Sequence, residues 1–195
     1  MSHQRHSNYR SNGPGHWRTG TSAASSPHPS TPYNSSHHSQ PACNVSEIIP
    51  RLFISDLSFA ENPAMLSAYH ITHILSTLSG SVYRPPPAQL PLQPARLHVR
   101  VEDSPFAELA AHLPSTTAWL YTALSNPESR VLVHCAEGVS RSVSVVAAFL
   151  MWQNGWEPDQ AVQYIKSRRV QADPNFGFIS QLHEHARTFL RRGHQ

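Results

Sequence analysis

From about residue 45 onward, short apolar runs alternate with stretches in which apolar residues recur at helical spacing. The short runs predict strands over residues 47–55 (broken near Pro50), 71–75, 97–101 and 131–133. The helical spacing predicts helices after Pro63 and over residues 115–125, 142–153, 157–168 and 176–191. Because strands that alternate with helices are typical of α/β proteins, we expect a sheet that is covered by helices on both faces.

Two stretches break this pattern. Five prolines lie between Gly80 and Pro94, and their density predicts an irregular surface excursion before the strand at 97–101. Residues 1–44 are rich in Ser, His, Pro, Asn and Gly and have almost no branched aliphatic residues. Such a segment buries too little apolar surface to fold. We therefore expect a disordered tail over 1–44 and one domain over 45–192.

The net positive charge of the chain comes from that tail. The sequence has 15 Lys and Arg against 12 Asp and Glu, a formal net charge of +3, and Arg5, Arg10 and Arg18 of the tail account for the excess. The predicted domain is electrically balanced, so the charge does not indicate a nucleic-acid partner. The irregularly spaced histidines of the tail are better explained as solvated side chains than as a metal site.

The sequence also bears on the compartment. It contains neither an apolar run long enough to cross a bilayer nor the apolar core of a signal peptide, which favours the cytosol or nucleus. Its two cysteines, Cys43 and Cys135, do not suggest a disulfide framework. Cys43 is either a free tail thiol or a resolving thiol for an oxidised Cys135.

The stretch Val-Leu-Val-His-Cys-Ala-Glu-Gly-Val-Ser-Arg-Ser at 131–142 runs from a predicted strand through a loop into a helix. A free cysteine is only roughly 3% thiolate at neutral pH, so a nucleophilic Cys135 needs stabilisation as an anion. Backbone amides of the loop, the positive end of the following helix and Arg141 can provide it, and Gly138 permits the tight turn. The same field suits a phosphate dianion, with the Arg141 guanidinium matching two of its oxygens. The alternatives are an inert buried cysteine, or a metal ligand, which the adjacent arginine and the lack of a second cysteine disfavour.

His134-Cys135-x-x-Gly138-x-x-Arg141-Ser142 resembles the signature of the cysteine-dependent phosphatases, specifically the small atypical dual-specificity protein phosphatases. The resemblance extends over about residues 46–190 and implies a protein tyrosine phosphatase-like fold, with a central mixed, mostly parallel sheet flanked by helices. It implies that Cys135 is the nucleophile, that Arg141 binds phosphate, that His134 tunes the thiolate and that Ser142 assists breakdown of a phosphocysteine. The phosphate-binding loop would consist of Ala136, Glu137, Gly138, Val139, Ser140 and Arg141.

A proton donor for the leaving group should lie elsewhere in the chain. Asp103 follows the predicted strand 97–101, at the carboxyl edge of the sheet, and it resembles the family's general acid. A turn-forming aspartate before Pro105 is the alternative role, and Glu102 is the second candidate. Asn175, in a block that resembles the family's, is expected to support the phosphate loop or to cap the last helix. Arg51 departs from the family, whose members often have glycine there.

One residue of the loop also bears on the class of substrate. Lipid and polyphosphate phosphatases of the superfamily tend to have lysines in this loop, whereas Glu137 would repel additional phosphates. The expected partners are therefore phosphorylated proteins, protein kinases among them, with no cofactor and no metal. Three alternatives stay open: a phosphoprotein-binding pseudophosphatase, a sulfur-carrying rhodanese, and the same chemistry on an inositol lipid, a sugar phosphate or an RNA 5′ end.

Overall fold

The computed structural model describes residues 44–192. The predicted tail, with Cys43 and the tail histidines, lies outside these residues apart from Asn44, so its disorder stays a prediction. In the described part, no helix is long and apolar enough to cross a membrane.

A five-stranded sheet forms the centre of residues 44–192. Its strands are β1 (Val45–Ile49), β2 (Leu52–Ser55), β3 (His73–Thr77), β4 (Ala95–Val99) and β5 (Val131–His134), in the order β1-β2-β5-β3-β4. Only the β1–β2 pair of this sheet is antiparallel; β5 pairs in parallel with β2 and β3, and β3 pairs in parallel with β4. The mixed, mostly parallel sheet is therefore confirmed.

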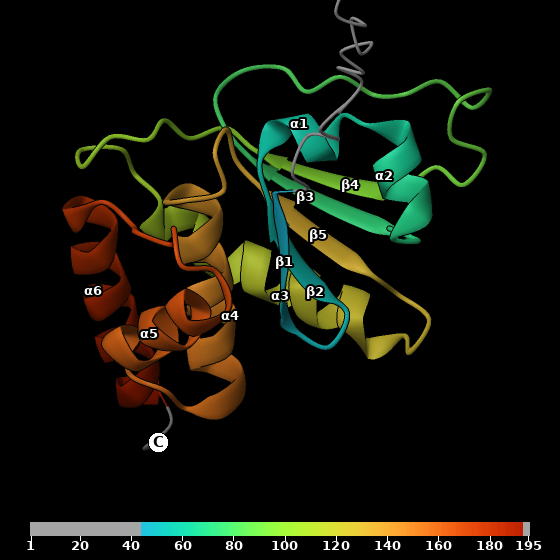
Figure 1. Ribbon diagram of the computed structural model, residues 1–195. Coiled ribbons are helices and arrows are strands. Elements are labelled where there is room, and N and C mark those ends of the chain that lie inside the picture. Colours follow the sequence, from blue (N-terminus) through green and yellow to red (C-terminus); the bar gives the residue numbers. More distant parts are fainter. Residues whose placement is uncertain (1–43, 193–195) are drawn as a thin grey trace, which may run out of the picture. The chain divides into compact units, whose positions relative to one another are not determined.

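Helices cover both faces of the sheet (Figure 1). They are α1 (Leu57–Ala60), α2 (Pro63–Ala68), α3 (Leu113–Ser125), α4 (Arg141–Asn154), α5 (Pro158–Arg168) and α6 (Phe176–Arg192), with a 3₁₀ turn at Ala110–His112. One core cluster joins α1 and α2 to Phe53, Ile74 and Leu132 of the sheet. The larger cluster packs α3 to α6 against the opposite side chains of the same strands. Helix α4 lies at its centre, with apolar residues buried around its whole circumference.

Some element boundaries differ from the predictions. The strand predicted at 71–75 is β3 at His73–Thr77, because Ile71 packs into the smaller core before the strand begins. The strand predicted at 97–101 is β4 at Ala95–Val99. Helix α1 was not predicted, because four residues are too few for a helical period to show; the Asp56 side chain accepts a hydrogen bond from Phe59 N and caps it.

Two predicted irregularities are present. The proline-rich segment between β3 and β4 contains neither helix nor strand. Arg51 lies in the β1–β2 turn with φ 71°, a left-handed conformation that favours glycine, so the departure from the family pattern costs backbone strain here. Its guanidinium donates to the carbonyl oxygens of Asn126 (2.7 Å) and Leu124 (3.2 Å), which ties the turn to the end of α3.

Candidate active site

The strand β5 delivers Cys135 to the carboxyl edge of the sheet. All four residues of β5 are buried between β2 and β3, with Val133 opposite Ile54 and Leu75. The loop 135–140 follows, and α4 begins at Arg141. Because β5 is hydrogen-bonded on both sides, the position of the loop is defined by the centre of the sheet.

Each carbonyl oxygen of the loop from Ala136 to Ser140 accepts a hydrogen bond from a group outside the loop. The donors, in loop order, are Leu57 N (2.9 Å), Arg169 Nη2 (3.2 Å), Arg169 Nε (2.7 Å), Asp173 N (2.9 Å) and the Ser144 hydroxyl (2.9 Å). With the carbonyl groups held outward, the loop amides are free to face the sulfur of Cys135. The loop thus has the arrangement that binds anions through backbone N–H groups.

Gly138 is the residue on which the turn depends. Its φ is 71°, and a Cβ atom there would lie 2.5 Å from both the carbonyl oxygen of Ser55 and Nη2 of Arg169. The overlap excludes a side chain, and the left-handed backbone adds to the preference for glycine. The absence of a Cβ lets the loop pack against the end of β2, and Gly138 N reaches within 3.1 Å of Cys135 Sγ.

The environment of Cys135 favours the thiolate. Burial by itself would raise the pKa of this thiol, but hydrogen bonds from the Ser142 hydroxyl (3.3 Å) and from the amides of Ser142, Gly138 and Val139 outweigh burial and lower the pKa below its ordinary value. Since Cys135 is almost completely buried, these donors replace the water that would otherwise solvate the anion. Cys135 therefore has the electrostatics of a nucleophile rather than of an inert core thiol.

His134 is fully buried beside Cys135. Burial lowers its pKa to about 4, so the ring is neutral at physiological pH. Its Nδ1 lies 3.2 Å from the carbonyl oxygen of Cys135, which can only accept, and its Nε2 lies 2.7 Å from the hydroxyl of Ser76. The proton is therefore on Nδ1, and Ser76 donates to Nε2. The neutral ring orients the backbone at Cys135 and adds no full charge to the site.

Asp103 lies next to the loop, four residues after the end of β4. Its Oδ1 accepts hydrogen bonds from the Ser140 hydroxyl (2.7 Å) and from Nδ2 of Asn175 (2.9 Å). Its Oδ2 lies 3.4 Å from Nε of Arg141, within ion-pair distance but without hydrogen-bond geometry. Arg141 also donates from Nη1 to the carbonyl oxygen of Val101 (3.3 Å), so one guanidinium connects the Asp103 loop to the start of α4.

Asn175 caps α6 and also contacts Ser140 of the loop and Asp103. Its Oδ1 accepts from Phe178 N (3.0 Å), which caps α6, while its Nδ2 donates to Asp103 and its backbone N donates to the Ser140 hydroxyl (3.1 Å). Gly177, in the next turn, packs so closely on the carbonyl group of Pro105 that a Cβ would overlap it. The start of α6 therefore holds the loop that carries Asp103.

Comparison with known proteins agrees with this geometry. Residues 52–188 match the model of the family "Dual specificity phosphatase, catalytic domain". This protein belongs to the dual specificity phosphatases. The phosphatase is 35% identical over 142 residues to mouse dual specificity protein phosphatase 26, covering 72% of this chain and 67% of that protein. It is 33% identical over 147 residues to mouse dual specificity protein phosphatase 13B, covering 71% of each chain.

Solved structures of a dual specificity phosphatase and of a phosphatase-like protein share the fold. Human DUSP28 superposes with a TM-score of 0.66 at 32% identity, over 75% of this chain and 95% of that one. Human tyrosine phosphatase-like serine/threonine/tyrosine-interacting protein superposes with a TM-score of 0.67 at 29% identity, over 75% and 97%. The chain is accordingly a protein phosphatase of the small atypical type, a hydrolase whose substrates are phosphorylated proteins.

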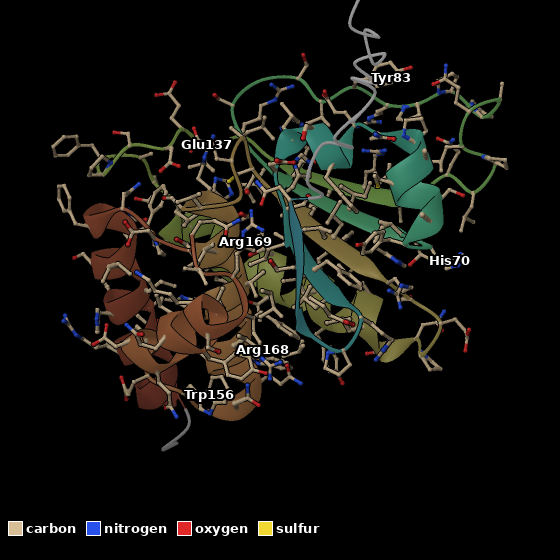
Figure 2. All side chains as sticks on the ribbon, viewed as in Figure 1. His70, Tyr83, Glu137, Trp156, Arg168 and Arg169 are labelled. Carbon is tan, nitrogen blue, oxygen red and sulfur yellow. The ribbon has the colours of Figure 1, made fainter. Side chains whose placement is uncertain are left out.

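The structure of this phosphatase brings the predicted site residues together at the loop that follows Cys135. The loop 136–141, His134, Ser142, Asp103 and Asn175 all lie within one network of contacts with Cys135 or with each other. Glu137 projects into solvent (Figure 2). Glu102, the second candidate for the acid, is exposed and makes no hydrogen bond or ion pair with any described residue.

Arg169 was missed by the sequence reasoning. It follows α5 directly, in a Lys-Ser-Arg-Arg run typical of a solvated helix end, yet it is 1% exposed. Besides its bonds to the carbonyls of Gly138 and Glu137, its Nη2 donates to Oδ1 of Asn44 (2.9 Å). No local signal separates this buried arginine from its exposed neighbour Arg168; only the tertiary path of the chain does. Ser140 was likewise predicted only as a loop position, whereas its hydroxyl connects Asp103 to Asn175.

Proposed function

We propose that this protein hydrolyses phosphotyrosine, phosphoserine and phosphothreonine in proteins through a phosphocysteine intermediate formed on Cys135. The observation that carries the proposal is the set of donors converging on the Cys135 sulfur, which lowers the pKa of the thiol despite its burial. A buried thiol whose pKa is lowered rather than raised requires a dedicated electrostatic environment, and such environments are characteristic of catalytic sites.

In the first step, Sγ of Cys135 attacks phosphorus and the bond from phosphorus to the substrate oxygen breaks. The loop amides and Arg141 hold the equatorial oxygens of the transferring group. Asp103, in its protonated form, gives its proton to the departing side-chain oxygen, so that a neutral alcohol or phenol leaves. The ion-pair distance of 3.4 Å between Asp103 Oδ2 and Nε of Arg141 supports this role, because Arg141 is the residue proposed to hold the phosphoryl group.

In the second step, water attacks the phosphocysteine, the S–P bond breaks, and inorganic phosphate and the thiolate are produced. The carboxylate of Asp103 accepts the proton of that water, which restores the acid for the next cycle. The Ser142 hydroxyl, 3.3 Å from Sγ, stabilises the thiolate as it leaves. This bond supports the role that the family resemblance implies for Ser142.

Protein side chains are the substrates that the surroundings of the loop favour. The exposed carboxylate of Glu137 repels additional phosphates, which disfavours polyphosphorylated lipids. Two aromatic side chains, Phe106 and Phe176, are 92% and 72% exposed on the segments that carry Asp103 and Asn175. Exposed aromatic side chains beside a polar site offer apolar contact to a polypeptide.

The decisive experiment is a rapid-quench reaction with a ³²P-labelled phosphopeptide, with Cys135→Ser as the control. Acid-quenched protein should carry label on Cys135 within the first turnover, and the Cys135→Ser variant should carry none. Unlabelled protein during rapid turnover would refute the phosphocysteine. Peptide binding without release of phosphate would instead identify a phosphoprotein-binding pseudophosphatase.

The substrate class is tested by competition. Phosphotyrosine and phosphothreonine peptides, an inositol phospholipid, a sugar phosphate and a 5′-triphosphorylated RNA should compete for turnover of an aryl phosphate, and the peptides should give the highest kcat/KM. Thiosulfate should not transfer sulfur to Cys135, which distinguishes the protein from a rhodanese. Because the chain's own groups supply the electrostatic stabilisation, activity should persist in chelators and be lost in vanadate or peroxide.

The chemistry also bears on the compartment. The low-pKa thiolate proposed here oxidises readily, so the enzyme requires a reducing compartment such as the cytosol or the nucleus.

A further inference from the structure

A second pocket, of about 200 Å³, lies between β4 and the proline-rich segment. Arginines from both sides line it: Arg84 from the proline-rich segment, and Arg96 and Arg100 from β4 and its end. The remaining polar groups of the lining come from Ser76, Ser81 and His98. None of these residues belongs to the Cys135 loop, and no carboxylate lines the pocket.

Arg96 is the unusual group in this pocket. Its Nη1 and Nη2 atoms are buried and have no hydrogen-bond partner within residues 44–192, nor does Arg96 form an ion pair there. Burial, and then the charge of Arg84, lower the pKa of Arg96. A buried guanidinium without a partner is costly, and a second cation nearby adds to that cost. The two arginines together therefore favour the binding of an anion.

Hydrogen bonds between β4 and the start of the proline-rich segment hold the walls of the pocket in place. Nε2 of His98 donates to the carbonyl oxygen of Leu78 (2.8 Å), and Arg100 Nη1 donates to that of Ser79 (3.0 Å). Both bonds attach the start of the proline-rich segment to β4. Glu61, an acid that contacts this segment, accepts from the backbone N of Tyr83 (2.6 Å), a residue labelled on the segment in Figure 2, and does not line the pocket.

We propose that this pocket binds a phosphoryl group, either as inorganic phosphate or as a phosphorylated side chain. A volume of about 200 Å³ is below the range of roughly 300–1,000 Å³ typical of drug-sized ligands, so the pocket suits a small ion. Guanidinium groups match the oxygens of a tetrahedral dianion, to which Ser81 can add a hydroxyl donor. A dianion also neutralises both arginines at once, which a monovalent ion does not.

The pocket adjoins the catalytic centre without being part of it. Ser76 of β3 pairs in register with His98 of β4 and His134 of β5, so the three side chains lie on one face of the sheet. Ser76 is one of the residues that line the pocket, and its hydroxyl donates a hydrogen bond to Nε2 of His134. An anion in the pocket would therefore be one side chain away from the histidine that precedes the nucleophile.

The test measures phosphate binding while the Cys135 loop is blocked, so its outcome does not depend on the proposed catalytic mechanism. The full chain carrying Cys43→Ser is treated with iodoacetate, which places a carboxymethyl group on Cys135, and mass spectrometry verifies a single adduct. Calorimetric titration with inorganic phosphate should then show one site per chain. Arg96→Met should weaken the affinity for phosphate about tenfold or more, because the charge-assisted hydrogen bonds from the guanidinium are lost.

Two further variants serve as controls. Arg168→Met removes an exposed arginine that lies over the Tyr164 ring, away from the pocket, and should leave phosphate binding intact. Ser81→Glu places a carboxylate beside Arg96 and should abolish phosphate binding while raising the melting temperature, so the test does not rest on Arg96→Met alone. Failure of the alkylated protein to bind either inorganic phosphate or a phosphothreonine peptide would overturn the proposal. Binding in Arg96→Met and Ser81→Glu equal to that of the alkylated protein without these substitutions would overturn it as well.

The source of the phosphoryl group is distinguished by a second titrant. A phosphothreonine peptide that binds the alkylated protein with the same dependence on Arg96 would identify a phosphorylated protein segment as the occupant. Binding of inorganic phosphate alone would identify the free ion, which is also the product of the reaction. Binding of neither contradicts the proposal.

Discussion

Burial of a neutral His134 should make the stability of this phosphatase depend on pH in a specific window. In the unfolded chain the imidazole titrates near its ordinary value of about 6.5. In the folded protein its pKa is lowered to about 4, mainly because the ring is buried. At pH values between these two, the His134 imidazole is protonated in the unfolded chain but neutral in the folded protein. Stability is therefore full above about pH 6.5 and falls as the pH decreases toward 4.

The size of the pKa shift sets how much of the free energy of unfolding is lost at low pH. One pKa unit corresponds to about 1.4 kcal/mol, so a shift from 6.5 to about 4 gives a maximum loss of about 3 kcal/mol. Between pH 7.5 and 4.5, titration covers about two units of this window, and the expected loss is about 2.5 kcal/mol. That is a large part of the stability of a typical domain.

Urea unfolding at pH 7.5 and 4.5, followed by circular dichroism, measures this loss. Both proteins compared carry Cys135→Ser, which removes the titration of the neighbouring thiol, and one of them also carries His134→Asn. Asparagine can keep the hydrogen bond to the carbonyl of Cys135 but does not titrate. Since the carboxylates are common to both proteins, the difference between their pH dependences isolates the histidine.

An equal pH dependence in the two proteins would refute the reasoning. It would mean that the His134 pKa is the same in the folded and unfolded states, so that burial does not hold the ring neutral. A steeper loss in the asparagine variant would refute it as well, because the sign of the linkage would be reversed.

Three further outcomes follow from the contacts at the site. Asp103→Asn should reduce turnover of an alkyl phosphate by about 10²- to 10⁴-fold and that of an aryl phosphate with a good leaving group far less; equal losses in steady-state assays would contradict its role as the acid. Ser142→Ala removes a hydrogen bond to the Cys135 sulfur and should raise the pKa of the thiol, shifting the pH profile of iodoacetate alkylation upward; an unmoved profile would show that the backbone amides suffice. Arg169→Met leaves two loop carbonyls without donors and should cost about 2 to 4 kcal/mol in urea unfolding and weaken vanadate binding; Arg168→Met, one residue away and exposed, should change neither.

The strand-loop-helix at 131–142 could be recognised from the sequence because its determinants are local. An apolar strand, a glycine at the turn and an arginine at the start of a helix impose the same backbone path wherever they occur together. The residues of that loop, and with them the family and the class of reaction, are accordingly readable from a single segment. The helices other than α1 were predicted for the same reason, with α4 and α6 within one residue of their observed ends.

The contacts that residues outside the loop make with it could not be predicted from the sequence. Asp103 was recognised by its resemblance to the family's acid, but its contacts with Ser140, Asn175 and Arg141 join three segments far apart in the chain. The strand boundaries shifted because burial by neighbouring strands, rather than local alternation, decides where pairing ends. The left-handed Arg51 is tolerated through bonds to carbonyls more than seventy residues away.

The sequence by itself predicted a nucleophile at Cys135, an anion-binding loop after it and the alternation of strands with the longer helices, because each depends on neighbours within a few residues. Only the tertiary structure decided that Arg169 is buried against the loop carbonyls, that His134 is neutral, and that Arg96 lies in a pocket without a counter-charge. Hydrogen bonding, burial and charge compensation depend on what the fold places around a side chain. An arginine at a helix end has the same local sequence whether it meets water, a carbonyl oxygen or an anion.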